Sequence, residues 1–175
     1  RNHYIRYPAM WKRVVKQLHK IDDYPHGNLR LTTATCITAL NIFYLPEFIT
    51  WKLEEDWKLL NKYPAGAGMI DLHLAYWPPQ LNCKVLPDWF KKETTLKYQD
   101  FGKWLKSNFQ KCNGVESLTW NEWKELPYGI KRLEGLVSFM NAEDWSERLP
   151  ETNEWCYKVS KERGLDFDKI FPDLE

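Results

Sequence analysis

The feature that most constrains the fold is a short phrase that occurs twice, 41 residues apart. Residues 41–48 read Asn-Ile-Phe-Tyr-Leu-Pro-Glu-Phe, and residues 82–89 read Asn-Cys-Lys-Val-Leu-Pro-Asp-Trp. Each phrase follows a strand-like run, and each places a proline and an acidic residue where a helix N-terminus favours them. The repeat predicts two successive strand–loop–helix units. Doubly wound sheets and (β/α) barrels repeat in this way, with their chemistry in the loops after the strands.

Residue patterns place the elements around these phrases. Runs rich in Thr, Ile and Leu predict strands at 29–38 and 69–76, and helix-spaced apolar residues predict a helix over about 46–62 between them. A strand, a helix and a second strand with short joins form a βαβ crossover, so we expect the two strands to be adjacent and parallel. The same periodicity predicts an amphipathic helix at 8–21, ahead of the first strand.

The pattern changes after the second phrase and becomes helical. Apolar spacing predicts a helix at 88–112 and another at 151–163, with Gly164 as its C-cap. We therefore expect an α/β fold, a portion of a partial (β/α) TIM-like barrel with parallel strands, followed by a mainly helical C-terminal region. The expected division is a barrel part at 1–95 and a helical extension packed on it at 96–175.

Composition narrows the class of protein. A net charge of only +1 gives no strong nucleic-acid signal, and no apolar run approaches the length of about 20 residues that a membrane span needs. The four cysteines are far apart and form no CxxC pair, so the spacing predicts reduced thiols in a cytoplasmic protein and no metal site made from this chain alone. Ten tryptophans provide large rigid surfaces for packing or for lining a pocket.

Strand alternation gathers polar side chains on one face of the predicted sheet. Thr32, Cys36 and Thr38 share a face of the first strand, and Asp71 and His73 share a face of the second. Buried parallel strands are normally apolar on both faces, so this face either meets a ligand inside a barrel or is wetted because helices do not cover it. Both interpretations stay open at this point.

The residues near the strand ends have alternative roles as well. Asp71 and His73 are either a proton-transfer pair or polar ligand contact, or an ordinary structural pair. Tyr76 and Trp77 follow the second strand, at the rim where parallel sheets bind substrates. Asn41 is either a rim contact or a turn residue that bonds its own backbone.

Several phrases together resemble one known family. Residues 4–11, the strand that closes on 41–46, residues 82–91 and the tail at 155–172 are similar to the later part of radical S-adenosylmethionine (SAM) proteins with a twitch-type domain. Members of this kind are common in phage and environmental sequences. The resemblance spans nearly the whole chain and comes from the order of the phrases.

The resemblance implies a partial (β/α) barrel that binds a [4Fe–4S] cluster through a CxxxCxxC loop, with SAM as the fourth ligand. Reductive cleavage of SAM then gives a 5′-deoxyadenosyl radical that abstracts hydrogen from the substrate. This sequence contains no CxxxCxxC and begins Arg-Asn-His without an initiator Met. We therefore expect it to be the C-terminal part of a longer enzyme, whose cluster loop precedes Arg1, and to bind neither cofactor alone.

The resemblance also implies two sets of cavity residues, while the catalytic residues stay unknown. The SAM-side set is Thr32, Thr38 and Asn41, and the substrate-side set is Asp71, His73, Tyr76 and Trp77. The substrate is unidentified, a peptide or protein being one option. The alternative function is a non-catalytic, Trp-rich α/β interaction domain whose polar strand face is merely solvated.

Overall fold

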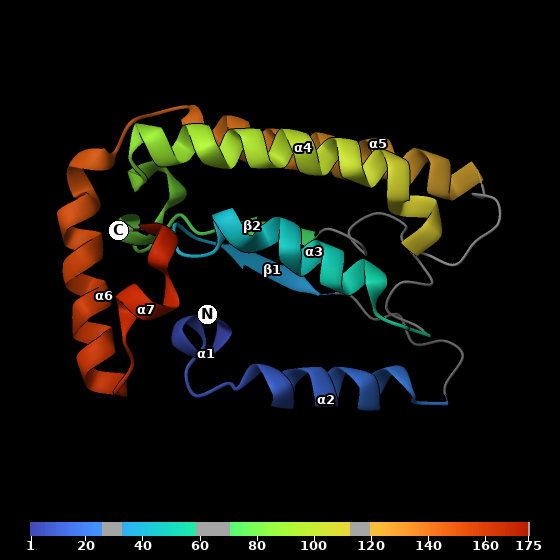
Figure 1. The fold of residues 1–175 in the computed structure, drawn as a ribbon, viewed down its shortest axis with the longest axis horizontal. Helices are drawn as coiled ribbons and strands as arrows, with labels where there is room; N and C mark the ends of the chain where they lie inside the picture. Colours follow the sequence, from blue (N-terminus) through green and yellow to red (C-terminus); the bar gives the residue numbers. More distant parts are fainter. Residues whose placement is uncertain (26–32, 59–70, 113–119, 175) are drawn as a thin grey trace.

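The computed structural model describes residues 1–25, 33–58, 71–112 and 120–174, with the backbone alone at Asp71, 109–112 and 120–128. Figure 1 shows the helices and strands in sequence colours. The helices are α1 Asn2–Ile5, α2 Trp11–Asp22, α3 Leu45–Glu54, α4 Asp88–Cys112, α5 Trp120–Asn141, α6 Leu149–Arg163 and α7 Phe167–Ile170. The strands are β1 Ala34–Ile37 and β2 Asp71–Leu74, and short 3-10 turns include η1 Ile42–Tyr44 and η3 Cys83–Val85.

The two strands form a parallel pair, joined through α3. Ala34 lies opposite Asp71, and Ile37 lies opposite Leu74. The predicted adjacent, parallel arrangement is confirmed, although each strand has only four residues. Residues 29–32 and 69–70 of the predicted strands lie outside the described residues. In the described part of the chain the sheet contains two strands and does not close into a barrel.

The helix predicted over 46–62 ends much earlier, at Glu54. The apolar spacing that extended it included Trp57, but this side chain folds back on the helix end. Its Nε1–H donates to the Lys52 carbonyl oxygen at 2.9 Å, and its ring stacks on His19 of α2 at a centroid distance of 4.5 Å. Trp57 therefore belongs to a tertiary contact that terminates α3. Residues 59–62 of the predicted helix lie outside the described residues.

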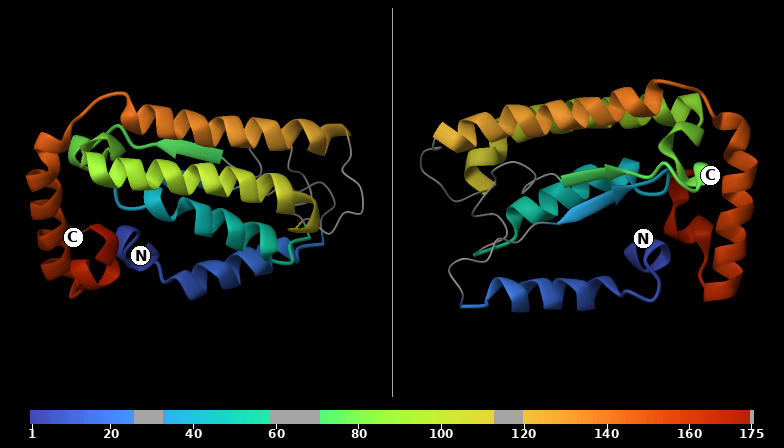
Figure 2. Two further views of the ribbon diagram at one scale, coloured as in Figure 1. Left: turned by 45° about the horizontal axis from the view of Figure 1, so that its top comes forward. Right: turned by 180° about the vertical axis from the view of Figure 1, so that it is seen from behind.

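Helices α3, α4 and α5 cover one face of the sheet (Figures 1 and 2). One buried cluster combines Ile37 of β1, Ile49 of α3, Leu105 of α4 and Met140 of α5. The expected boundary at residue 95 falls inside α4, whose bounds match the helix predicted at 88–112. The β/α part and the helices after it therefore share a core.

A second buried cluster joins the two ends of the chain. Tyr4 of α1 is 1% exposed, and its hydroxyl donates to the Cys156 carbonyl oxygen of α6 at 2.5 Å. The Arg163 guanidinium, also on α6, donates to the Tyr4 carbonyl oxygen. Helix α6 ends at Arg163, and the next residue, Gly164, has a φ of 61° and is the left-handed C-cap that the sequence predicts. These contacts hold α1 beside α6.

Candidate functional site

The two copies of the repeated phrase fold alike at the carboxyl ends of the two strands. Asn41 precedes η1 and then α3, and Asn82 precedes η3 and then α4. Pro46 is the second residue of α3, and Pro87 directly precedes α4. The Ala39 N–H donates to the Leu81 carbonyl oxygen at 2.8 Å, so the two loops lie side by side. The predicted repetition of the strand–loop–helix start is confirmed.

The Asn41 carboxamide closes the end of β1. Its Oδ1 accepts from the Thr38 N–H at 2.8 Å, and its Nδ2 donates to the Cys36 carbonyl oxygen at 2.8 Å. The Thr38 hydroxyl accepts from the Leu40 N–H at 3.3 Å and lies 3.4 Å from the same Oδ1. Thr38 and Asn41, both expected on the SAM side, are thus brought together, and their side chains fix the loop itself.

Asn82 occupies the matching position in the second loop but is completely buried. Its Oδ1 accepts from the Lys84 N–H at 3.0 Å, which caps η3. Its Nδ2 has no hydrogen-bond partner among the described residues. Burial of an amide donor without a partner is costly, so the Asn82 carboxamide is less completely satisfied by the described residues than the Asn41 carboxamide is.

The two faces of the sheet differ as the alternation predicts. Ile37 lies in the core, and Leu72 and Leu74 pack against it. The register places Cys36 beside His73 on the opposite face, where His73 is exposed. The right-hand view of Figure 2 shows both strands in front of α3. Thr32 and the Asp71 side chain, also expected on this face, lie outside the described residues.

Two exposed aromatic side chains mark the end of β2. Tyr76 is 65% exposed and Trp77 is 82% exposed. The Tyr76 ring packs edge-on against Phe139 of α5 at a centroid distance of 5.4 Å. The rim at the end of β2 therefore presents exposed aromatic surface.

A cleft of about 730 Å³ lies between β1, α2 and α3, with α1 at one end. Trp11 and Trp51 meet edge to face across it at 4.8 Å. The main apolar and strand-edge lining residues are Trp11, Val14, Leu18, Cys36, Phe48 and Trp51. The strand pattern did not reveal this cleft, because its walls come from helices far apart in the sequence. Sequence signals existed for each wall separately: the apolar stripe of the helix predicted at 8–21, and the pair Phe48 and Trp51, which share a helical face.

The cysteines that the structure describes do not fit an iron–sulfur cluster. Cys36 is on β1, Cys83 is in η3 and Cys156 is on α6, and the described residues contain no group of ligands that could hold a metal ion. Burial raises the pKa of the Cys83 and Cys156 thiols to about 12 each, so neither is a ready thiolate. An iron–sulfur cluster would need ligands from outside the described residues.

Two buried lysines lie close to the second loop. The Lys84 Nζ pairs with Glu143 Oε1 at 2.5 Å and lies 4.5 Å from the Phe139 ring centroid. Lys91 Nζ donates to the Glu143 carbonyl oxygen at 3.2 Å and lies 3.5 Å from Asp144 Oδ1. The Lys84 ammonium and the Trp145 indole N–H both bond Glu143 and lower the pKa of its carboxyl group. These pairs fasten the second loop and the start of α4 to the segment after α5.

Comparison with protein-family models, curated proteins and solved structures finds no match to this chain. The family named from the sequence therefore stays a prediction. Among the described helices, none combines the length and apolar character that crossing a bilayer requires.

Proposed function

We propose that this chain is the C-terminal part of a radical SAM enzyme and that the uncovered face of its parallel sheet borders the reaction cavity. The observation that carries the proposal is the unequal covering of β1 and β2. Helices and apolar side chains bury one face, whereas Cys36 and His73 occupy the other, next to the rim formed by Tyr76 and Trp77. An inner barrel surface has this asymmetry, so β1–α3–β2 is proposed as one piece of a partial (β/α) barrel.

In this proposal the cofactors belong to the longer parent. The bound cluster and SAM supply the radical chemistry there, and the described cysteines contribute no ligand. Thr32, Thr38 and Asn41 are proposed to border the SAM side. Asn41 does so by holding the loop, since its oxygen and its amide nitrogen both bond backbone groups of β1 and its end. The proposed substrate-side set is Asp71, His73, Tyr76 and Trp77.

The second candidate function is a non-catalytic, Trp-rich interaction domain. The exposure of Trp77, at 82%, supports it, because tryptophan is enriched among the side chains that protein partners bury. The reading frame of the parent protein distinguishes the two candidate functions. A CxxxCxxC motif before Arg1 supports the enzyme, and a complete frame without the motif supports the interaction domain.

The test of the proposed enzyme is SAM cleavage by the anaerobically reconstituted parent protein. With a chemical reductant, we expect 5′-deoxyadenosine and methionine to form in equal amounts. His73→Ala, on the substrate side, should leave this cleavage within about twofold of the wild type. Thr38→Val should weaken SAM binding roughly tenfold, equivalent to about 1.4 kcal/mol. Lys92→Ala, on the exposed surface of α4, is the control. Absence of any SAM cleavage contradicts the proposed function.

A further inference from the structure

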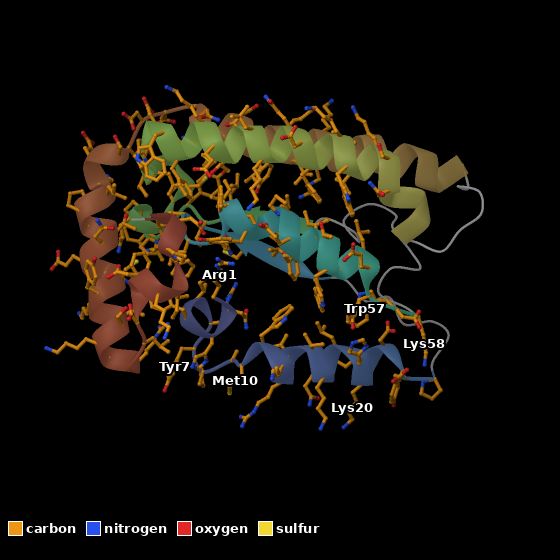
Figure 3. All side chains as sticks on the ribbon, viewed as in Figure 1. Arg1, Tyr7, Met10, Lys20, Trp57 and Lys58 are labelled. Carbon is orange, nitrogen blue, oxygen red and sulfur yellow. The ribbon has the colours of Figure 1, made fainter. Side chains whose placement is uncertain are left out.

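The outer face of α2 carries a row of basic side chains. All are exposed, and we call them the basic stripe: Lys12, Arg13, Lys16 and Lys20. At about 3.6 residues per turn, they lie within about 100° of the helix circumference. The opposite face of α2, with Val14 and Leu18, lines the cleft beside β1. Figure 3 shows α2 along one edge of the molecule, with Lys20 on the side away from the sheet.

Acidic side chains do not balance this stripe. Residues 1–21 contain six Lys and Arg and no Asp or Glu, although the whole chain has 25 basic and 24 acidic residues. Within the described part of the chain, the side chains of the stripe have no hydrogen-bond or ion-pair partner. The acids at the end of α2 are engaged with Lys58, since Asp22 accepts from its backbone N–H at 2.6 Å and Asp23 pairs with its ammonium. The stripe is therefore a local cluster of unneutralised positive charge.

The stripe also works against the stability of its own helix. Lys12 and Arg13 lie in the first turn of α2, where the positive end of the helix dipole disfavours cations. Lys12, Lys16 and Lys20 follow one another at four-residue spacing, so neighbouring ammonium groups repel. Acidic residues at the same spacing would have stabilised the helix instead. This charge pattern favours an anionic partner that relieves the repulsion.

The surroundings of the stripe favour a nucleic acid over a membrane or an acidic protein. An amphipathic helix binds a bilayer by burying its apolar face in it, whereas the apolar face of α2 is turned toward α3, where Trp11 meets Trp51 at 4.8 Å. Lysine is depleted at protein–protein interfaces, and three of the four stripe residues are lysines. Phosphate groups, in contrast, are bound by Lys and Arg through charge and need no apolar contact.

Exposed aromatic side chains flank the stripe. Tyr7 precedes α2 and is 50% exposed, and Tyr24 follows α2 and is 55% exposed. Figure 3 shows Tyr7 close to Met10, at the N-terminal end of α2. Rings in such positions stack on bases that are free of a duplex, as in proteins that bind single strands. From Lys12 to Lys20 the stripe is about 12 Å long, roughly the span of four phosphates along a stacked strand.

We propose that the basic stripe binds the phosphate backbone of a single-stranded nucleic acid, whose bases stack on Tyr7 and Tyr24. The contact is independent of base sequence, because charge and ring stacking do not distinguish the bases. A net charge of only +1 does not oppose it, since salt screens charges beyond about 10 Å and a local cluster acts by itself. The proposal goes beyond the proposed function, does not depend on it, and adds a class of partner.

The experiment measures the binding of the full-length protein to a labelled thymidine oligonucleotide of about 12 nucleotides by fluorescence anisotropy, from about 50 to 200 mM salt. The double variant Lys16→Gln with Lys20→Gln should weaken binding at least about fivefold. It should also make the slope of log K against log salt shallower by about 1.4, because two phosphate contacts are lost. Glutamine forms helices about as well as lysine and removes repulsion, so the variant should fold. The matched control is Lys92→Gln with Lys106→Gln, which removes the same charge from exposed positions on α4.

The same assay tests the stacking and the choice of partner. Tyr7→Ala and Tyr24→Ala should each weaken binding about fivefold and leave the salt slope unchanged, and unchanged affinity in both variants overturns the assignment to a single strand. A dissociation constant above about 1 mM at the lowest salt overturns the proposal, as does equal weakening in the α4 control. Tighter binding to a duplex of the same length, to polyglutamate, or to vesicles of equal parts phosphatidylcholine and phosphatidylserine assigns the stripe to another partner and overturns it too. The assay requires neither a cluster nor SAM, so this proposal and the proposed function fail separately.

Discussion

The two loops built on the repeated phrase contain the same elements in the same order, but their asparagine side chains bond different groups. Asn41 and Asn82 each start a 3-10 turn that leads into a helix. Asn41 is half-buried and uses both its oxygen and its nitrogen on β1 and its end. Asn82 is fully buried, and among the described residues only its oxygen has a partner. A repeated sequence can therefore specify a repeated turn, while the surroundings decide how much each asparagine stabilises it.

The largest expected difference concerns the two asparagines. Asn41→Ala removes a donor and an acceptor from backbone groups at the strand end and should lower the free energy of unfolding by about 2–4 kcal/mol. Asn82→Ala removes one bond and one unpaired donor and should cost about 1–2 kcal/mol. Urea unfolding of both variants measures the difference.

Serine variants provide the matched control for this pair. Asn82→Ser keeps a short oxygen that can still cap η3, so it should recover part of the loss. Asn41→Ser cannot reach both the Cys36 carbonyl and the Thr38 N–H, so it should recover little. Equal losses of unfolding free energy in all four variants would show that the two asparagines stabilise their loops equally, and would contradict the prediction.

The next largest expected effect is a pH-dependent loss of unfolding free energy that arises in the second loop. Burial raises the pKa of Cys83 to about 12 from a usual value of 9.0. The folded state favours the protonated Cys83 thiol. The stability that depends on this preference is complete below pH 9 and is lost as the pH rises toward 12. The loss is at most about 1.4 kcal/mol per pH unit in that window.

Cys83→Ser isolates this contribution, because serine does not ionise in the same range. Between pH 8 and pH 10.5 the wild type should lose more unfolding free energy than the variant, as measured by urea unfolding. The pKa of Tyr98 is also raised, mainly by burial and in smaller part by the Cys83 charge, so most of the Tyr98 contribution is common to both proteins. Parallel pH profiles for the two proteins would contradict the prediction.

The smallest expected effects concern two side-chain hydrogen bonds, called tethers here, that hold the two loops to helices α4 and α6. The Tyr98 hydroxyl donates to the Ile42 carbonyl oxygen at 2.7 Å, and the Thr152 hydroxyl donates to the Gln80 carbonyl oxygen at 2.6 Å, just before the second loop. Tyr98→Phe and Thr152→Val should each cost about 1 kcal/mol in thermal or urea unfolding. Ser107→Ala, at an exposed position on α4, is the control. A loss below about 0.3 kcal/mol would show that a tether is dispensable.

The sequence predicts the features that depend on neighbouring residues. Strand alternation separates Leu72 and Leu74 from His73, and the Leu-Pro phrases locate the starts of α3 and α4. It does not predict the early end of α3, because Trp57 is withdrawn from the helix by a contact with His19, 38 residues earlier. The cleft is missed for the same reason. Its walls at Trp11 and Trp51 meet only after the chain has folded.

The contact between Tyr4 and Cys156 has a consequence for the order of folding during synthesis. The two residues are 152 positions apart, and α1 has no other buried anchor as deep as Tyr4. At about 5–20 residues per second, a ribosome needs roughly 8–30 s to make the intervening chain. The β1–α3–β2 unit and α4 can associate during that interval, whereas α1 must wait for α6. Helix α1, although made before β1, α3 and α4, is thus among the last of these elements to find its place.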